Sequence, residues 1–357
     1  MMTPRVLEKA DSVQQEFEMI KREDLEKREY AYLSEFATKA KESKGRVFPE
    51  EECDLRTCFQ RDRDRIIHSK ALRRLMHKTQ VFLAPEGDHY RTRLTHTLEV
   101  SQIARTIARG LGLNEDLTEA IAMGHDLGHT PFGHNGEEFL NEIHPGGFDH
   151  ATQSLRVVDV IEKTSSGKSL NLSWEVRDGI KNHGSKANPG TLEGKIVSLS
   201  DRIAYINHDI DDALRAQVIT LDEIPKDCLD LFGYTHGERI NSLVMDIIIN
   251  SDGKNGIFQS EDHAREMNIL RDWMFEHVYR NPEVKKNAEL EKVQTLIFAL
   301  YEYYVKNPDK LPREYQELLD EWGKNEVAKD YLAGMTDRYA LFMYDKLFVP
   351  AGWNLRN

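Results

Sequence analysis

Residues 125–137 read His125-Asp126-Leu127-Gly128-His129-Thr130-Pro131-Phe132-Gly133-His134-Asn135-Gly136-Glu137. This stretch combines three imidazoles and two carboxylates with glycines and a proline. An adjacent His-Asp pair at the end of a helix offers one metal ion a nitrogen ligand and an oxygen ligand. The further histidines and the glutamate then lie within a loop's reach of whatever the metal binds. The stretch therefore indicates a metal site at a helix end.

The helix before this stretch has start and stop signals. Asn114 is a suitable N-cap, and the two acidic residues after it favour the positive end of the helix dipole. We expect the helix to stop near Gly128, with Pro131 preventing its restart. The His-Asp pair then belongs to the last turn, where its side chains can point into a cleft.

Apolar residues recur at helical spacing almost throughout the chain, which predicts an all-α protein. One stripe consists of Leu94, Leu98, Ile103, Ile107 and Leu111. A later helix is expected from Lys195 to about Arg215. One face of it carries Asp201, Tyr205, His208 and Asp209. No repeat or linker divides the chain, so we expect one body over residues 1–357, with a core at about 60–215 and a helical C-terminal region at about 221–357.

The bulk composition excludes several classes of protein. Of 357 residues, 48 are Lys or Arg and 61 are Asp or Glu, so the net charge is −13. This balance disfavours a protein that coats nucleic acid, although it permits a local basic pocket for phosphates. No apolar run reaches the roughly 18–20 residues of a membrane span, and the charged N-terminal segment lacks a signal-peptide core. Cys53, Cys58 and Cys228 form no disulfide framework, so we expect a cytoplasmic protein with reduced thiols.

Four residues from three expected helices are candidate metal ligands: His96, His125, Asp126 and Asp201. Together they supply two nitrogens and two oxygens and leave positions for water and substrate. Mixed nitrogen and oxygen ligation suits Mn, Fe, Co, Ni or Zn, and the sequence does not select among them. Such a cation lowers the pKa of bound water toward about 7. The pattern therefore predicts a metal-dependent phosphohydrolase.

Further motifs carry a resemblance to a known family. They are Arg61-Asp62-Arg63-Asp64-Arg65-Ile66-Ile67-His68-Ser69, Arg73-Arg74-Leu75, Lys78-Thr79-Gln80-Val81, Arg93-Leu94-Thr95-His96, Gly147-Phe148-Asp149-His150, Ser200-Asp201-Arg202-Ile203-Ala204-Tyr205-Ile206-Asn207-His208-Asp209-Ile210-Asp211-Asp212-Ala213 and Gly334-Met335-Thr336-Asp337-Arg338-Tyr339-Ala340. With residues 125–137, they resemble the HD-domain deoxyguanosinetriphosphate triphosphohydrolases, specifically the shorter bacterial triphosphohydrolase-like members. The resemblance covers most of the chain. It implies an all-helical HD fold that cleaves dGTP, or a broader range of dNTPs, at the α-phosphorus into nucleoside and inorganic triphosphate.

The resemblance also implies roles for individual residues, beginning with the same four metal ligands. His134 matches the catalytic histidine, and Glu137 matches the carboxylate that orients it. An imidazole of near-neutral pKa can protonate a departing 5′-oxygen. His129 and His150 match histidines that line the α-phosphate and stabilise the charge growing on it. Arg93 matches the phosphate-binding arginine, whose forked guanidinium suits two oxygens at once.

Sugar recognition and assembly are further implications of the resemblance. Gln80 and Asp209 match the pair that hydrogen-bonds the sugar 3′-OH. Tyr205 matches the tyrosine packed against the sugar, where a ribose 2′-OH would collide. Mg is compatible with the bound substrate. Several members form dimers, tetramers or hexamers, and some need a second dNTP as allosteric activator, so we expect a homo-oligomer.

Two other functions stay open. HD sites also hydrolyse nucleoside monophosphates, cyclic dinucleotides and alarmone pyrophosphates, and the pattern of Gln80, Tyr205 and Asp209 speaks against these only by resemblance. A non-catalytic nucleotide-sensing regulator with weak binding to single-stranded DNA would retain a vestigial site. The intact ligands and the intact His134–Glu137 pair disfavour it.

Three conspicuous features are interpreted as structural. The alternating charges of residues 61–65 indicate a salt-bridge network rather than catalysis. The aromatic cluster Tyr301-Glu302-Tyr303-Tyr304 is typical of a core or a subunit interface. For His183, in Lys181-Asn182-His183-Gly184, a position facing the site stays open, but an ordinary structural role is favoured.

Overall fold

A computed structural model describes residues 19–80, 91–164, 167–184, 187–281 and 287–350. Within these ranges it contains sixteen α-helices, labelled α1 to α16, and no β-strand. The β-type pairings found there are isolated bridges. The predicted all-α class is confirmed.

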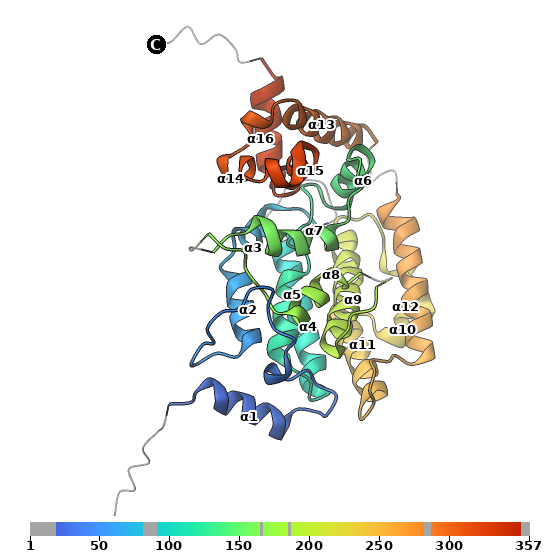
Figure 1. Ribbon diagram of the computed structural model, residues 1–357. Coiled ribbons are helices and arrows are strands. Elements are labelled where there is room, and N and C mark those ends of the chain that lie inside the picture. The colour runs from blue at the N-terminus through green and yellow to red at the C-terminus, as the bar shows by residue number, and fades with distance from the viewer. Residues whose placement is uncertain (1–18, 81–90, 165–166, 185–186, 282–286, 351–357) are drawn as a thin grey trace, which may run out of the picture.

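The helices form two groups along the chain. The first comprises α1 (Arg22–Tyr32), α2 (Cys58–Ile67), α3 (Lys70–Arg74), α4 (Arg93–Gly110), α5 (Glu115–Gly124), α6 (Gly133–Ile143), α7 (His150–Arg156), α8 (Trp174–Lys181) and α9 (Leu192–Arg215). The second comprises α10 (Lys226–Phe232), α11 (His236–Ser251), α12 (Glu261–Met274), α13 (Asn287–Lys306), α14 (Arg313–Gln316), α15 (Leu319–Ala333) and α16 (Asp337–Phe348). Short π-helical turns extend α7 and α12, at Val157–Ile161 and Phe275–Tyr279. Figure 1 shows α4, α5 and α9 in the middle of the molecule, between α2 on one side and α10 and α12 on the other.

The three central helices begin where the sequence supplies an N-cap. Thr92 before α4, Asn114 before α5 and Thr191 before α9 each accept a hydrogen bond from a backbone N–H of the first turn. The predicted Asn114 cap is confirmed. The helix expected from Lys195 begins earlier, at Leu192, because Thr191 caps it.

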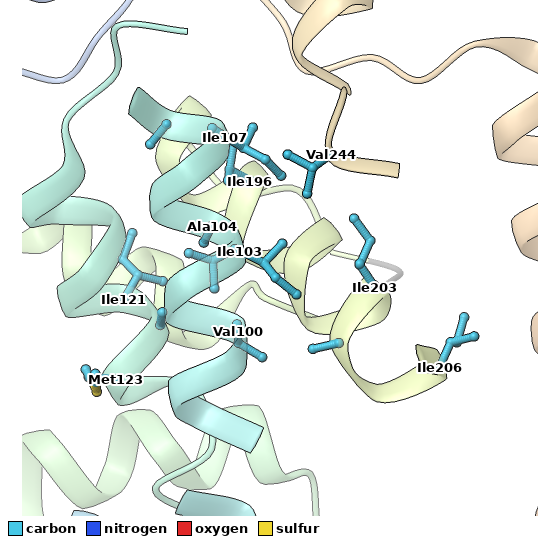
Figure 2. Close-up of a cluster of buried hydrophobic side chains, with 14 of the residues drawn as sticks. Val100, Ile103, Ala104, Ile107, Ile121, Met123, Ile196, Ile203, Ile206 and Val244 are labelled. Carbon is cyan, nitrogen blue, oxygen red and sulfur yellow. The ribbon is translucent and has the colours of Figure 1, made fainter. Parts of the chain in front are cut away.

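A continuous hydrophobic core joins α4, α5 and α9. Ile103 and Ile107 of α4 are buried in it. Figure 2 shows them beside Ile121 of α5 and Ile203 of α9, with Val244 of α11 reaching the same cluster. Burying one such side chain stabilises the fold by about 1.5–3 kcal/mol. This core fixes the relative positions of the helices that carry the candidate ligands.

A second hydrophobic cluster lies toward the C-terminus. It joins Leu140 of α6 to Leu300 of α13 and Leu332 of α15. Tyr301 and Tyr304 are buried in the same cluster, so their interpretation as core residues is confirmed. Figure 1 shows α13–α16 gathered with α6 at the opposite end of the molecule from α1. The helices of the second group therefore divide between two cores, because α10, α11 and α12 pack in the first.

Two details of the predicted helices are wrong. Leu98, expected on the apolar stripe of α4, is 50% exposed, and the buried face runs through Val100 instead. Pro131 does not prevent a restart, because α6 begins at Gly133. The chain turns into α6 through two consecutive residues of positive φ, Phe132 at 63° and Gly133 at 59°. A non-glycine residue in this region is uncommon and marks a turn that its surroundings must hold.

The charged run at residues 61–65 forms the predicted salt-bridge network. Asp62 is fully buried and pairs with Arg46. Arg65 pairs with Glu50 at 2.7 Å. These contacts anchor α2 to the loops around it.

Two expectations concern the chain as a whole. Cys53, Cys58 and Cys228 are all free thiols, as predicted. Among the described residues, no helix combines the length and the apolar character that crossing a membrane requires.

Candidate metal centre and active site

The four predicted metal ligands converge between α4, α5 and α9. His96 lies near the start of α4, His125 and Asp126 directly follow α5, and Asp201 lies within α9. His96 Nε2 is 3.0 Å from Asp201 Oδ1 and 4.0 Å from Asp126 Oδ2. His125 Nε2 is 3.8 Å from each of the same two oxygens. Ligands that lie about 2.0–2.2 Å from one cation are roughly 3–4.3 Å from each other, and these four nitrogen–oxygen distances lie in that range. His96, His125 and Asp126 form a group whose ligand atoms all lie within 4.8 Å of one another, and Asp201 contacts its two histidines.

The ring nitrogen of His125 that faces this centre is available to bind a metal. His125 Nδ1 donates a hydrogen bond to the Ala122 carbonyl at 2.7 Å, so Nε2 carries the lone pair. Nε2 is buried and has no hydrogen-bond partner in the described part of the chain. A bound cation would satisfy this orphaned acceptor. The residues therefore fit a divalent metal.

Both carboxylates of the centre are held in their ionised form. Burial alone raises the pKa of Asp126, but the Arg93 guanidinium and the neighbouring imidazoles bring that pKa well below its ordinary value. Burial also raises the pKa of Asp201, and the hydrogen bond from His96 together with the nearby His125 outweighs it. Two carboxylates and two imidazoles form the mixed oxygen and nitrogen donor set that suits a divalent transition metal.

Glu137 makes its closest contact with His150 rather than with His134. The backbone N–H and the Nδ1–H of His150 both donate to Glu137 Oε1, each at 2.9 Å. His134 Nδ1 is 3.7 Å from Glu137 Oε2, and the His134 side chain is 73% exposed. The predicted catalytic pair, His134 and Glu137, thus lies near the start of α6. His150, the first residue of α7, is the histidine that Glu137 contacts most closely.

His183 lies in this group, so the less favoured of the two interpretations, that it faces the candidate site, describes its position. His183 Nδ1 donates to the Ile180 carbonyl at 2.7 Å, and its Nε2 is 3.2 Å from His150 Nε2. Since His183 accepts at Nε2, His150 carries a proton on both ring nitrogens. Burial lowers the pKa of His150, but Glu137 raises it to about 9. The one signal in the sequence was the position of His183 just after α8, which resembles that of His125 after α5.

His129 and Arg93 present buried groups that the protein itself does not use. His129 is 1% exposed, and neither ring nitrogen has a hydrogen-bond partner among the described residues. Its ring stacks on that of His150, with centroids 4.9 Å apart. Arg93 Nη1 donates to Asp126 Oδ2 at 2.8 Å, whereas its buried Nε and Nη2 have no hydrogen-bond partner within the described ranges. Unsatisfied buried donors are costly, so they mark a place for an anionic ligand beside the candidate metal centre.

Comparison with known proteins identifies the family. Residues 93–206 match the HD domain, and residues 257–346 match the phosphohydrolase-associated domain. The chain is 55% identical to a deoxyguanosinetriphosphate triphosphohydrolase-like protein of Caldanaerobacter subterraneus subsp. tengcongensis, over 94% of this chain and 98% of the relative. It is 46% identical to a protein of the same name from Clostridium tetani, over 88% of this chain and 92% of the relative.

The chain belongs to this family of deoxyguanosinetriphosphate triphosphohydrolase-like proteins. The predicted resemblance is confirmed, and the protein is an HD-domain phosphohydrolase. A phosphohydrolase of known structure from Bacteroides thetaiotaomicron is similar in fold, with a TM-score of 0.52 at 15% identity, over 79% of this chain and 68% of that one.

The residues predicted to contact a sugar have distinct environments in the phosphohydrolase. Gln80 is buried with its Oε1 unpaired among the described residues, and Val81 of the same motif lies outside the described ranges. Tyr205 follows the metal ligand of α9 by one turn, and burial raises its pKa to about 12. Asp209 is buried, and its Oδ2 accepts a hydrogen bond from the Tyr279 hydroxyl at 2.5 Å. Tyr279, on the π-helical turn after α12, belongs to no motif, so the sequence analysis missed it.

Residues of the phosphohydrolase-associated domain accept hydrogen bonds that support the candidate site. Asp337, the first residue of α16, accepts from the Phe132 N–H at 2.9 Å, and from the N–H and hydroxyl of Thr79 at 3.0 and 2.7 Å. The buried Lys78 ammonium donates to the His129 carbonyl and, at 2.8 Å, to the last carbonyl of α15. The C-terminal helices thereby hold the turn that leads into α6 and its catalytic candidates.

Proposed function

We propose that this HD-domain phosphohydrolase cleaves 2′-deoxynucleoside triphosphates at the α-phosphorus and releases the deoxynucleoside and inorganic triphosphate. The position of Arg93 supports this most directly. Its guanidinium binds Asp126, a candidate metal ligand, and keeps two buried nitrogens unpaired. A phosphate that accepts from those nitrogens lies next to the cation. The names of the relatives, which refer to deoxyguanosine triphosphate, support this class of substrate.

The proposal assigns each residue one task around the α-phosphate. When bound, a divalent cation at this centre supplies Lewis-acid assistance and lowers the pKa of water. Arg93 donates hydrogen bonds to two phosphate oxygens, and His129 donates one to an oxygen on which negative charge grows. His150 adds a positive charge, because Glu137 holds a proton on its Nδ1. His134 gives a proton to the departing 5′-oxygen, and its exposed imidazole can recover one from solvent.

The sugar is the second determinant of the proposed substrate. We assign the 3′-OH to Gln80 and Asp209, of which Gln80 has a buried acceptor without a partner in the described chain. Tyr205 closes the position that a ribose 2′-OH would occupy. The proposal therefore predicts that ribonucleoside triphosphates are poor substrates.

Product analysis tests the proposal. The purified protein is incubated with each dNTP and each NTP in the presence of Mn²⁺ or Mg²⁺, and products are separated by anion-exchange chromatography. Free deoxynucleoside plus triphosphate supports it, whereas dNMP plus pyrophosphate contradicts the cleavage position. Each assay is repeated with a second dNTP present, because the family resemblance implies an activator in some members.

The same assay separates the alternatives. Hydrolysis of nucleoside monophosphates or of an alarmone, with dNTPs untouched, would indicate an HD phosphohydrolase of another specificity. No product from any nucleotide, together with salt-dependent binding of single-stranded DNA, would indicate a regulator.

A further inference from the structure

His208 connects the candidate metal centre to the carboxylate assigned to the sugar. His208 lies on α9 and is completely buried. Its Nε2 is 3.0 Å from Nδ1 of the metal ligand His96. Its Nδ1 is 2.7 Å from Asp209 Oδ1. One imidazole therefore touches a ligand of the metal on one side and Asp209 on the other.

The positions of the ring protons on His96 and His208 can be assigned from the groups at the two ends of this series of contacts. With a cation held at His96 Nε2, which faces the candidate metal centre, the proton of His96 would lie on Nδ1. That N–H would then donate to His208 Nε2, and the remaining proton of His208 would lie on Nδ1, beside Asp209 Oδ1. Nδ1 of His208 and Oδ1 of Asp209 are 2.7 Å apart but do not form a hydrogen bond, and neither atom has a hydrogen-bond partner in the described chain.

Asp209 is the last residue in this series of contacts. Its Oδ2 accepts from the Tyr279 hydroxyl at 2.5 Å, so the carboxylate is anchored from the side of α12 as well as from α9. A carboxylate behind a ligating histidine fixes the orientation of its ring and raises its basicity toward the metal. Here the carboxylate acts through an intervening imidazole. The other histidine ligand, His125, is oriented by the Ala122 carbonyl instead.

We propose that His208 is a positioning residue that orients His96 for metal binding and ties the metal centre to Asp209. The part of the inference that treats Asp209 as the sugar contact rests on the proposed function. The part that links His208 to metal affinity does not depend on which substrate the protein cleaves. Loss of a hydrogen-bonded partner behind a ligating histidine lowers metal affinity by about 10–100-fold. We expect the same range for loss of His208, and a smaller loss when the ring is replaced by a side chain that can both accept and donate.

Titration of the full-length protein with Mn²⁺ alone, by isothermal calorimetry without nucleotide, tests the inference. His208→Phe keeps a buried ring but removes both contacts, so the Kd for Mn²⁺ should rise about 10–100-fold. His208→Gln keeps an acceptor for His96 and a donor for Asp209, so its Kd should lie closer to that of the unmodified protein. Asp209→Asn should also weaken binding, because it removes the negative charge. Gln80→Ala is the matched control, since Gln80 shares the proposed sugar role but makes no hydrogen bond to His96 within the described residues, and the Kd of this variant for Mn²⁺ should not change.

Equal Mn²⁺ affinity in His208→Phe and the unmodified protein would overturn the inference. An equal loss in Gln80→Ala would do so as well, because it would show that any change near the sugar site weakens the metal. Circular dichroism of the metal-free variants establishes that they fold, and His208→Gln and Asp209→Asn carry the test if His208→Phe does not. Weakened Mn²⁺ binding in a protein that cleaves no dNTP would leave this inference standing while the proposed substrate fails.

Discussion

Buried polar atoms without partners concentrate around the candidate active site. His125 Nε2, both ring nitrogens of His129 and two nitrogens of Arg93 all belong to this group in the described chain. Leaving one such atom unsatisfied costs about 1–3 kcal/mol, and folded proteins contain few of them. These side chains are therefore held ready for a ligand at the expense of stability.

Arg93→Lys tests the proposed phosphate contact. Lysine can keep the charge beside Asp126 but cannot also offer the two nitrogens that Arg93 leaves unpaired. We expect kcat/KM for the dNTP to fall roughly 10–100-fold, which corresponds to the loss of one charge-assisted hydrogen bond of about 1.5–3 kcal/mol. Arg91→Lys is the control, because Arg91 is already paired with Glu99 at 2.8 Å, and it should change kcat/KM by less than about twofold. Equal effects of the two substitutions would contradict the role of Arg93.

Glu137→Gln should change how stability depends on pH. Glu137 raises the pKa of His150 from 6.5 to about 9, so the folded protein holds this proton more tightly than the unfolded chain. The resulting stabilisation is complete below pH 6.5 and disappears as the pH rises through about 9. In thermal melts of the metal-free protein, the Tm difference between the unmodified protein and Glu137→Gln should be largest at the acid end of this window and shrink toward its alkaline end.

Glu138→Gln provides the control for this measurement. Glu138 is the next residue of α6 and is exposed, so its replacement should produce no Tm difference that varies across the same pH window. A constant gap for Glu137→Gln would show that His150 does not owe its proton to Glu137.

At the scale of elements, local signals in the sequence predicted some boundaries and not others. The Asn114 cap and the end of α5 follow from rules that involve only neighbouring residues. The restart of α6 after Pro131 does not, because the positive φ of Phe132 depends on a hydrogen bond to Asp337, which is distant in sequence. The exposure of Leu98 likewise depends on which neighbours α4 meets.

The residues of the candidate site likewise divide into those that the sequence could predict and those that it could not. The candidate metal ligands could be singled out because they occur in short motifs with recognisable chemistry, and the structure brings them close together. His183 and Tyr279 could not, since each reaches the site only through tertiary packing, after α8 and after α12. Likewise, the preference of Glu137 for His150 over His134 depends on how α7 meets α6.

Asp337→Ala tests how α16 supports the active site. The substitution leaves the Phe132 N–H and both donors of Thr79 without their acceptor, so we expect a loss of about 2–4 kcal/mol in the free energy of unfolding. Turnover should fall as well, because the turn into α6 is no longer held. Asp345→Ala, an exposed position on the same helix, should stay within about 0.5 kcal/mol in urea unfolding. Retention of full stability and turnover in Asp337→Ala would exclude this bracing role.

For the whole molecule, the ligands and the catalytic candidates are supported by different cores. The candidate metal ligands come from helices of the first hydrophobic cluster, whereas α6 packs with α13 and α15 in the second. The candidate active site therefore draws on both clusters, and the phosphohydrolase-associated domain contributes to both. A cation that joins α4, α5 and α9 should accordingly stabilise the protein as a whole.

Metal removal tests this consequence. Mn²⁺ at 100 times its Kd should add about 2.7 kcal/mol to the free energy of unfolding, and EDTA should reverse the rise in Tm. His125→Asn should abolish the rise, because it removes the ligand whose Nε2 is otherwise unpaired. His77→Asn, at an exposed histidine, should leave it intact. A rise of the same size in His125→Asn would place the stabilising metal elsewhere.

Anomalous diffraction from crystals grown with Mn²⁺ tests the central claim most directly. Our account predicts one peak about 2.0–2.3 Å from His96 Nε2, His125 Nε2 and a carboxylate oxygen of both Asp126 and Asp201. A structure without a peak at this position, or with two of these side chains turned away from it, would contradict the account.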